Sequence, residues 1–411
     1  MARKHRHLAA WLAPALVLAC VLAGCRRDAP PPQAAEPRAG DPAATRVLAS
    51  ERGPLTVAEI ATGLQHPWSL AFLPDGSMLV TERPGRLRRI TRDGRVSAPI
   101  AGVPTVYAEG QAGLLDVVLS PGFARDRTLY LAFCEPSLRG NLCGTAVARA
   151  RLDGDALREV RVVYRQQPKA SAGTHVGGRL VFDRAGLLYV THGDNRTTPE
   201  AAQQLDRLQG KLVRIDAAGG IPVGNPFAGR ADARAEIWSY GHRNMQGAAL
   251  NPATGAVWTS EHGPMGGDEL NIPRAGRNYG WPLVTSGVDY SGQPVPGSVG
   301  ASAPGMAPAH HVWAQSPGLS GMLFYTGDAF PQWRGNLFLG ALAASELIRL
   351  ELEGDRIVHE ERLLQPLGRR IRDVRQGPDG AIYLLTDEED GKLLRLSAAP
   401  ASMGGEKIAR P

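Results

Sequence analysis

The most constraining feature of the chain is a pattern that recurs six times along it. Each copy is an apolar run, a turn containing Pro, Asp or Gly, and a second apolar run; the clearest copy reads LAFLPDGSMLV at residues 70–80. Two short apolar runs joined by such a turn are typical of a β-hairpin. The other copies begin at Leu115, Leu180, Ala248, Met322 and Val374. The sequence therefore predicts six hairpins.

The hairpins are expected to belong to larger units. Further strands are predicted beside them, for example at residues 86–90 and 392–396. Radial repetition of such units protects strand edges from pairing with other chains. We therefore expect an all-β fold, a six-bladed β-propeller of four-stranded antiparallel blades, over residues 51–398. A pair of sandwiches or an open β-solenoid is the alternative. Long inserts follow the third, fourth and fifth copies, and such inserts usually build a functional face.

Turn-forming residues are frequent, and one helix is expected. Glycine (49 residues) and proline (32) make up about a fifth of the chain, which suits many turns without indicating disorder. In the segment 198–208, Thr198 is a capping residue, Pro199 stands in the first turn, and the acidic Glu200 is beside it. This combination is typical of a helix start.

The first 24 residues have the parts of a secretory signal peptide. Basic residues at positions 3, 4 and 6 precede an apolar run over residues 8–22, and small residues follow. Leu-Ala-Gly-Cys at residues 22–25 resembles a bacterial lipobox, so we expect Cys25 to be the lipidated first residue of the mature protein. Cys20 is a weaker candidate. An ordinary signal peptide or a transmembrane anchor is the alternative, although the run is short for a span.

The segments outside the propeller are expected to be a flexible tether at residues 25–50, rich in Pro, Ala and Arg, and a loose tail at residues 399–411. Loss of residues 1–24 removes three basic residues and no acidic one, lowering the formal net charge from +6 to +3. This charge is too small to indicate nucleic-acid binding. The lipid anchor would hold the protein on the periplasmic face of a bacterial membrane. We favour the outer membrane, because Arg26 forms no inner-membrane retention signal.

Two cysteines remain in the propeller region. Cys134 and Cys143 flank a loop-like stretch of eight residues. In an oxidising compartment, such a pair is expected to form a local disulfide. A metal site is the alternative, but no further cysteine remains to complete one.

The chain lacks the local motifs of several common enzyme classes. It contains no Gly-x-Ser-x-Gly elbow, no His-Glu-x-x-His motif, no P-loop and no Gly-x-Gly-x-x-Gly turn. These absences argue against serine hydrolase, zinc protease and nicotinamide chemistry. Polar clusters stand instead beside the hairpins, at residues 110–113, 174–179, 191–195, 241–247, 261–271 and 369–373. Equivalent strand ends of a propeller point to one face near the central channel, so these clusters could converge.

His175 lies among glycines and is a candidate general base, because imidazole titrates near neutrality. Asp194 could orient this imidazole and stabilise its protonated form. A hydrogen-bonded structural histidine is the alternative. His192, His242 and His262 make weaker claims.

Charged residues near expected strand ends suggest two kinds of binding. Arg243, Arg370 and Arg372, if they converge, would hold an anion with several carboxylates or phosphates; surface salt bridges are the alternative. Asp268 and Glu269 stand among glycines and carbonyl-rich turns, which is compatible with calcium. The EF-hand pattern is absent there.

In combination, these segments resemble the glucose/sorbosone dehydrogenase family, and within it the periplasmic aldose sugar dehydrogenases. Its members are soluble quinoproteins that bind pyrroloquinoline quinone (PQQ) and calcium on a six-bladed propeller. The likeness covers about residues 55–396 and rests on HPWSLAFLPDG, GQAGLLDV, HVGGRLVF, GHRNMQG, EHGPMGGDELN, NYGWP and RIRDV, all in family order. It implies PQQ-dependent oxidation of aldose sugars at the anomeric carbon to lactones, with an external electron acceptor.

The resemblance also implies roles for single residues. His175 matches the base that takes the proton of the anomeric hydroxyl, and Asp194 matches the acid that supports it. Arg243 matches a contact near the reactive carbonyls of PQQ. Further matches to cofactor contacts are Gln111, which also touches the sugar, Asn244, Tyr290, Ala341, Leu342, Ala343, Arg370, Ile371 and Arg372.

Two calcium sites are implied in the same way. Gly263 and Pro264 match carbonyl ligands of the calcium that holds PQQ. Glu269 and Tyr279, the latter through its backbone oxygen, match a second, structural calcium. Some members place a lysine on the cofactor in the fifth blade, where residues 340–348 here contain none. Backbone groups of residues 341–343 are expected to serve instead.

Two other functions are compatible with a propeller of this kind. A calcium-dependent lactone hydrolase would need neither the three arginines nor the Gly-His-Arg-Asn segment. A non-catalytic propeller that binds sugar or protein would be expected to lose His175 or the arginines. Fold alone does not decide between these functions. A monomer and a dimer are both compatible with the sequence.

Overall fold

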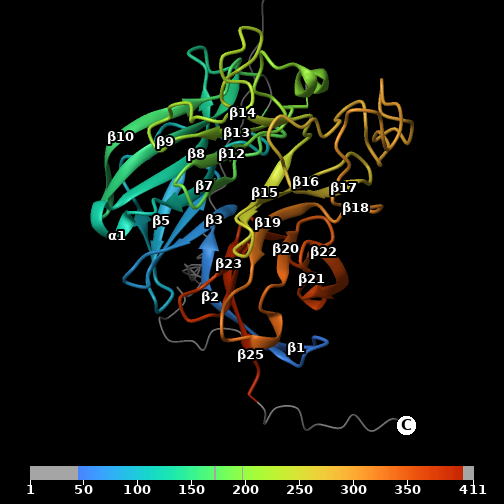
Figure 1. Cartoon of the computed structure of the whole chain (residues 1–411). Helices are drawn as coiled ribbons and strands as arrows, with labels where there is room; N and C mark the ends of the chain where they lie inside the picture. Colours follow the sequence, from blue (N-terminus) through green and yellow to red (C-terminus); the bar gives the residue numbers. More distant parts are fainter. Residues whose placement is uncertain (1–44, 171–172, 197, 401–411) are drawn as a thin grey trace, which may run out of the picture. The chain divides into compact units, whose positions relative to one another are not determined.

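The computed structural model describes residues 45–170, 173–196 and 198–400. These residues form six antiparallel sheets arranged around a common centre, as the predicted six-bladed β-propeller requires (Figure 1). The expected signal peptide, the lipidation at Cys25, most of the tether and most of the tail lie outside the described residues. Within the described part of the chain, no helix is long and apolar enough to cross a membrane.

Five sheets are built from consecutive strands. The first contains β3 (Pro67–Phe72), β4 (Met78–Glu82), β5 (Arg86–Ile90) and β6 (Val96–Pro99). The second contains β7 (Leu114–Leu119), β8 (Thr128–Pro136), β9 (Cys143–Asp153) and β10 (Ala156–Arg165). The third contains β11 (Leu180–Phe182), β12 (Leu188–Thr191), β13 (Lys211–Ile215) and β14 (Ile237–Tyr240). The fourth contains β15 (Met245–Leu250), β16 (Val257–Glu261), β17 (Asp268–Asn271) and β18 (His311–Trp313). The fifth contains β19 (Leu319–Phe324), β20 (Leu337–Ala341), β21 (Glu346–Glu353) and β22 (Arg356–Leu363).

The sixth sheet joins strands from both ends of the described chain. Its order is β1 (Thr45–Leu48), β2 (Leu55–Leu64), β25 (Gly391–Ala398), β24 (Ile382–Thr386) and β23 (Ile371–Gln376). The antiparallel pairing of β2 with β25 closes the ring. The predicted boundary at residue 51 is wrong, because β1 pairs in register with β2 although its sequence was assigned to the tether. A four-residue edge strand is too short to stand out from a tether by its pattern.

All six predicted hairpins are present as the inner strand pairs of the sheets: β3–β4, β7–β8, β11–β12, β15–β16, β19–β20 and β23–β24. The first strand of each pair contacts the first strand of the next sheet, which gives the closed ring β3, β7, β11, β15, β19, β23. In an antiparallel pair, the start of one strand lies beside the end of the other. The residues before each first strand and after each second strand therefore meet at one end of the central channel.

Helices are short in the described residues. They are α1 (Phe123–Asp126) and the 3-10 helices η1 (Pro199–Gln203), η2 (Pro331–Trp333) and η3 (Gln365–Leu367). The helix predicted over residues 198–208 is therefore right only for its first turn. The ammonium group of Lys211 binds the carbonyl oxygens of Ala201 and Ala202, at 2.8 and 3.0 Å. An α-helix would need these oxygens for its own next turn.

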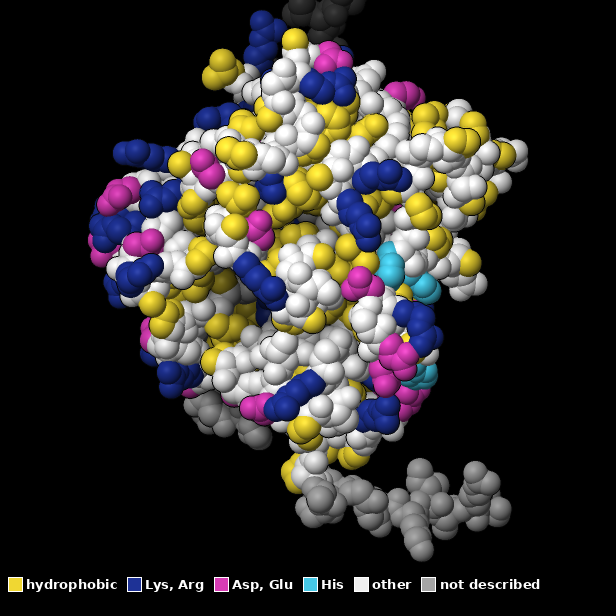
Figure 2. Space-filling model, in the orientation of Figure 1, with side chains coloured by type: hydrophobic (Ala, Val, Ile, Leu, Met, Phe, Trp, Pro, Cys, Tyr) yellow, Lys and Arg dark blue, Asp and Glu magenta, His cyan; other side chains and the backbone are white. Residues whose placement is uncertain are grey.

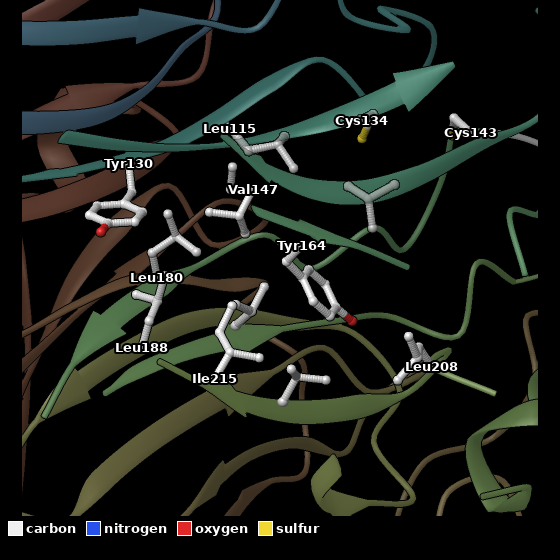
Figure 3. Packing of buried hydrophobic residues seen from close by; sticks show 14 of the residues in the cluster. Leu115, Tyr130, Cys134, Cys143, Val147, Tyr164, Leu180, Leu188, Leu208 and Ile215 are labelled. Carbon is white, nitrogen blue, oxygen red and sulfur yellow. The ribbon is translucent and has the colours of Figure 1, made fainter. Parts of the chain in front are cut away.

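The core lies between neighbouring sheets. Between the second and third sheets, buried Leu115, Val147, Leu180, Leu188 and Ile215 pack against one another (Figure 3). Each is at most 2% exposed. This packing holds the starts of β7 and β11 close together. The polar loops that precede the two strands are therefore also close together.

The predicted disulfide is not formed in this structure, where Cys134 and Cys143 are both free and buried on the paired strands β8 and β9 (Figure 3). The register pairs Cys134 with Thr145, so the two cysteines stand diagonally. Diagonal partners are about 7 Å apart, whereas a disulfide needs Cβ atoms about 4 Å apart. The thiols interact instead. A hydrogen bond from Cys134, with help from the backbone N–H of Gly173, lowers the pKa of Cys143 to about 7.

The molecular surface mixes charges of both signs. On the face drawn in Figure 2, Lys and Arg side chains alternate with Asp and Glu and with apolar side chains. Four arginines also line a cavity at the end of the central channel.

Candidate active site

A cavity of about 590 Å³ opens at the end of the channel where the inner strands begin. Every sheet contributes to its wall, because each inner hairpin presents its first-strand start and second-strand end there. The structure thus brings together segments that lie up to 319 residues apart, from Trp68 to Asp387. The predicted site residues that line the cavity are Gln111, His175, Arg243, Gly263, Pro264, Tyr290, Leu342, Ala343, Arg370 and Arg372.

His175 and Asp194 form a hydrogen-bonded pair in this wall. Nδ1 of His175 lies 2.7 Å from Oδ1 of Asp194, and both side chains are buried. The backbone of His175 has φ 44°, a conformation that non-glycine residues rarely adopt. Two bonds hold it: the His175 N–H donates to Oε1 of Gln111 at 2.9 Å, and its carbonyl accepts from the N–H of Asn195 at 3.2 Å. The imidazole is therefore fixed at both its backbone and its ring.

Gly193 permits the close approach of the two loops that carry His175 and Asp194. A Cβ atom placed on Gly193 would lie 1.9 Å from the carbonyl oxygen of His175. No other residue type can occupy this position without moving the loop that carries Asp194. The run His192–Gly193–Asp194 thus owes its glycine to the contact between the two loops.

The environment keeps His175 neutral near pH 7. Burial lowers its pKa, the hydrogen bond and charge of Asp194 oppose this, and the positive charges of Arg243 and Arg196 lower the pKa further. Since Nδ1 is engaged by Asp194, Nε2 is the ring nitrogen able to accept a proton. A neutral imidazole with an oriented carboxylate behind it is suited to act as a general base.

Four arginines also contribute to the wall of the cavity. Arg83, Arg243, Arg370 and Arg372 all line the cavity. Asp387 pairs with Arg372 at 2.6 Å and lies 3.6 Å from Arg370. The other acidic lining residue, Asp268, accepts hydrogen bonds from backbone N–H groups of Gly263, Gly318 and Leu319. The cavity therefore has an excess of positive charge, which suits an anion with several carboxylates.

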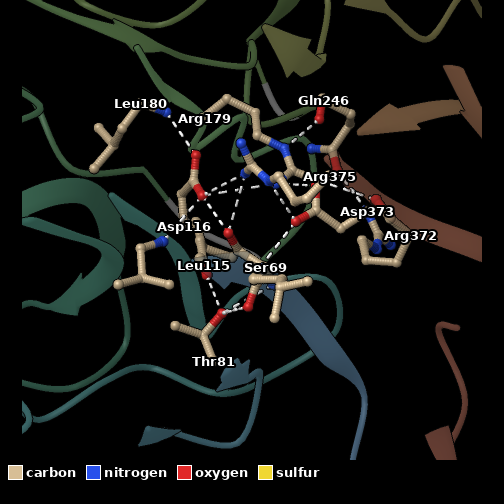
Figure 4. Close-up of polar contacts among 12 residues, drawn as sticks. Ser69, Thr81, Leu115, Asp116, Arg179, Leu180, Gln246, Arg372, Asp373 and Arg375 are labelled. Atoms are coloured by element: carbon tan, nitrogen blue, oxygen red, sulfur yellow. Dashed lines mark hydrogen bonds and ion pairs between the residues drawn. The ribbon is translucent and has the colours of Figure 1, made fainter. Parts of the chain in front are cut away.

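Beneath the cavity, Arg179 connects four inner strands (Figure 4). Its guanidinium donates to the carbonyl oxygens of Gln246 at 2.8 Å and Arg372 at 3.0 Å. It also lies 3.0 Å from the carboxylate of Asp373 and 4.0 Å above the ring of Trp68. The side chain of Arg372 in turn donates to Oε1 of Gln246 at 2.8 Å. This buried network fixes the backbone of the arginine-bearing strand β23.

The loop after β16 carries two of the predicted calcium ligands, Gly263 and Pro264. It is tied to the loop before β15, because the carboxylate of Glu261 accepts from Nδ1 of His242 at 2.9 Å and from the backbone N–H of Arg243 at 2.6 Å. The guanidinium of Arg243 donates to the carbonyl oxygen of Gly263 at 2.5 Å. That carbonyl oxygen therefore accepts a hydrogen bond from a cationic group.

A small second pocket lies on the other side of the same loop. Glu269 and Tyr279 line it together with Gly263 and Pro264. Burial and the nearby carboxylate of Glu261 raise the pKa of Glu269 to about 8. Buried carboxylates that repel one another are the donor set that a divalent cation would neutralise. No cluster of three or more His, Cys, Asp or Glu side chains suited to a metal occurs among the described residues, so carbonyl oxygens would have to complete a site.

Some predicted cofactor contacts stand behind the cavity wall. Asn244 is 1% exposed, and its side-chain oxygen accepts from the N–H of Gly177 at 3.2 Å and from Nε2 of Gln246 at 3.1 Å. The side chains of Ala341 and Ile371 are fully buried in the cores of β20 and β23. Asn244 therefore orients the loops around His175, and the other two positions support the strands.

Several lining residues are absent from the predicted site, among them Trp68, Arg83, Gln246 and Asp387. Two of them follow the second strand of a hairpin, Arg83 after β4 and Asp387 after β24. In the third sheet, Asp194 also follows the second strand of the hairpin, three residues after the end of β12. The position directly after the second strand of a hairpin was therefore the signal that could have identified Arg83 and Asp387.

Comparison with known proteins gives a consistent relationship. A family model described as Glucose / Sorbosone dehydrogenase matches residues 64–395. Aldose sugar dehydrogenase YliI of Escherichia coli (strain K12) is 51% identical over 337 residues, covering 81% of this chain and 90% of that protein. The solved structure of the soluble aldose sugar dehydrogenase from Escherichia coli has a TM-score of 0.81 and 49% identity, over 84% of this chain and 100% of that one.

A second solved structure is that of the PQQ-bound form of an aldose sugar dehydrogenase from Streptomyces coelicolor. It has a TM-score of 0.70 and 27% identity, and the match covers 88% of this chain and 99% of that one. The similarity thus extends over nearly the whole described propeller, including every segment that lines the cavity. The chain belongs to the glucose/sorbosone dehydrogenase family.

Proposed function

We propose that this protein is a PQQ-dependent aldose sugar dehydrogenase that oxidises the anomeric carbon of aldoses to give lactones. The observation that carries the proposal is the cavity in which the His175–Asp194 pair faces four arginines. The relatives named as aldose sugar dehydrogenases, one of them PQQ-bound in its solved structure, support the same reading.

His175 would act on the sugar hydroxyl. Its Nε2 would take the proton of the anomeric hydroxyl, and the carboxylate of Asp194 would stabilise the resulting imidazolium through Nδ1. Gln111 holds the backbone of His175 and lines the cavity, so its amide group can also orient the sugar. PQQ, when bound, would supply the acceptor for the hydride of the anomeric carbon.

The arginines would hold the cofactor. PQQ carries three carboxylates, and Arg370 and Arg372 can form charge-assisted hydrogen bonds with them. Arg243, next to His175 and Gly263, would stand nearest the reacting groups. Leu342 and Ala343 line the same cavity, and their backbone groups would serve where some family members place a lysine.

Calcium would be held by backbone oxygens of the loop after β16. Gly263 and Pro264 line both the main cavity and the second pocket, and Glu269 with Tyr279 would bind a structural ion in the second pocket. A calcium ion beside the cofactor would supply a Lewis acid. Carbonyl and carboxylate oxygens are the ligands that calcium prefers.

Reconstitution tests this proposal. The chain from residue 26 onward, which keeps β1, would be purified without cofactor and mixed with glucose and other aldoses and an artificial electron acceptor. PQQ and calcium would be added separately and together. We expect acceptor reduction only with both. His175→Ala should abolish turnover while PQQ still binds, as measured by equilibrium dialysis.

Two results would contradict the proposal. One is the absence of PQQ binding in the presence of calcium. The other is hydrolysis of a lactone with calcium alone, without oxidation of any aldose, which would favour the calcium-dependent hydrolase instead.

We also propose that the protein is exported and anchored by lipid at Cys25. The lipobox-like sequence at residues 22–25 supports this. Metabolic labelling with a radioactive fatty acid should mark the wild-type chain in cells, and Cys25→Ala should abolish the label and release the protein into the soluble periplasmic fraction. Separation of the two membranes would then show whether the outer membrane is its location.

A further inference from the structure

Trp281 stands directly behind the candidate acid–base pair. Its indole Nε1–H donates to Oδ2 of Asp194 at 2.8 Å. The other carboxylate oxygen, Oδ1, receives Nδ1 of His175 at 2.7 Å and the backbone N–H of Arg196 at 2.7 Å. Both oxygens of Asp194 are thus occupied, and the carboxylate can meet the imidazole in only one orientation.

The indole is itself held firmly. The backbone N–H of Trp281 donates to the carbonyl oxygen of Gly241 at 2.9 Å, and its own carbonyl accepts from Nε2 of Gln203 at 2.6 Å. The ring is 9% exposed and packs with Ala202 and Val295. Its contacts therefore come from the η1 segment, the loop before β15 and the long insert between β17 and β18.

The same ring also contacts a predicted cofactor ligand. The guanidinium carbon of Arg243 lies 5.1 Å from the centroid of Trp281. The indole N–H thus donates a hydrogen bond to Asp194, while a face of the same ring lies near Arg243. Trp281 connects the base-supporting acid of the third sheet with the arginine of the fourth.

We infer that Trp281 is a positioning residue: its indole N–H fixes the carboxylate of Asp194 so that this carboxylate orients His175. The inference rests on the proposed function for its catalytic meaning, because it concerns the residue that the proposed function assigns as base. Because the hydrogen bonds run from Trp281 through Asp194 to His175, the inference can be tested by measuring the pKa of His175, without any turnover.

The direction of the effect follows from the hydrogen bonds. A donor to Oδ2 disperses part of the carboxylate charge away from His175. In Trp281→Phe, that charge acts more fully on the imidazolium, so the pKa of His175 rises. The other charged groups that face His175, Arg243 and Arg196, are unchanged by the substitution.

The experiment is an NMR titration of the cofactor-free protein, labelled with ¹⁵N-histidine. The resonance of His175 is identified by its loss in His175→Gln. We expect Trp281→Phe to raise the pKa of His175 by on the order of half a unit. The acid limb of kcat/KM in the reconstituted enzyme should move to higher pH by the same amount.

Trp333→Phe is the matched control. Trp333 is also a buried tryptophan, but its Nε1 has no hydrogen-bond partner among the described residues. Its substitution removes an indole from a core without breaking a hydrogen bond, and it should leave the titration of His175 unchanged. If Trp281→Phe does not fold, benzothienylalanine at position 281 keeps the ring shape and replaces the N–H by sulfur.

Two outcomes are decisive. An unchanged pKa of His175 in both variants of Trp281, as in Trp333→Phe, would overturn the positioning role. An upward shift in the Trp281 variants alone supports it. If the wild-type protein oxidises no aldose with PQQ and calcium, the proposed function fails, while the titration still decides whether Trp281 controls the Asp194–His175 pair.

Discussion

His175 and Asp194 are separated by 19 residues and meet at 2.7 Å because one precedes β11 and the other follows β12. The fourth sheet repeats this relationship: His242 precedes β15, and Glu261 at the end of β16 lies 2.9 Å from its Nδ1. The repeated pairs differ in their access. His175 lines the cavity, whereas His242 is fully buried and stacks on Tyr279. One histidine–acid pair is thus open to a substrate, and the other ties two loops together.

Asp194→Asn should leave the fold intact and reduce catalysis. The amide keeps a hydrogen-bonding group beside His175, but it cannot stabilise an imidazolium by charge. We expect kcat to fall by about 10²- to 10⁴-fold, as when the acid behind a catalytic histidine is neutralised. Steady-state kinetics of the reconstituted enzyme would measure this. Glu261→Gln, in the equivalent pair, is the comparison. If Asp194→Asn retained full kcat, Asp194 would not be supporting the base.

The activity of the wild-type enzyme should decline on the acid side below the ordinary pKa of histidine. Burial lowers the pKa of His175, and the base must be neutral to accept a proton, so activity is full above that pKa and is lost as the pH falls through it. Arg196 contributes to the lowering. In Arg196→Gln, the acid limb of kcat/KM should therefore move upward by a few tenths of a unit. A shift of the acid limb of kcat/KM to lower pH would contradict this electrostatic explanation.

The hairpins were predictable because their signal is local. Alternation and turn residues specify β3–β4 and its five equivalents, and propeller geometry then brings His175, Arg243 and Arg370 to one cavity. Contacts that depend on the details of register or on distant partners were not predictable. Cys134 and Cys143 stand diagonally rather than opposite each other. Trp281 meets Asp194 across 87 residues of chain, through an insert without a repeating pattern.

Calcium should stabilise the protein through Glu269. The carboxylate is buried beside that of Glu261, and a bound divalent cation would offset this repulsion. We expect calcium to raise the melting temperature of the wild-type protein by several degrees and a chelator to reverse this, because a ligand that binds only the folded state stabilises it. Glu269→Gln should lose most of this calcium-dependent shift.

The control for this experiment is Glu346→Gln. Glu346 is also buried, but it pairs with Arg362 of the fifth sheet and is not a predicted calcium ligand. Its calcium-dependent shift should equal that of the wild type even if its melting temperature is lower. An unchanged shift in Glu269→Gln would place the stabilising ion elsewhere.

Lys211 should be important for stability rather than for chemistry. Its ammonium group is fully buried and donates to the carbonyl oxygens of Ala201, Ala202 and Gln209 at 2.7–3.0 Å. Lys211→Met keeps much of the volume but leaves buried carbonyl groups without this donor. We expect a loss of about 2–4 kcal/mol in the free energy of unfolding, measured by urea denaturation. Lys392→Met, at a partly exposed ion pair with Glu59, should cost about 1 kcal/mol or less.

The buried network under the cavity should couple stability to anion binding. Arg179→Met leaves the carboxylates of Asp116 and Asp373 with Arg375 as their remaining cation, and it removes the donor to the carbonyl oxygen of Arg372. Breaking a buried ion pair from one side costs about 3–5 kcal/mol. We therefore expect a loss of that size in urea denaturation and a weaker affinity for PQQ, because β23 carries Arg372.

Arg375→Met is the matched control. The side chain of Arg375 is 25% exposed, and its hydrogen bonds within the described residues go to side chains and not to the carbonyl groups of β23. This substitution should therefore cost less stability and leave the affinity for PQQ close to that of the wild type. Equal effects of the two substitutions on PQQ affinity would show that the network supports the sheet as a whole and does not specifically position Arg372.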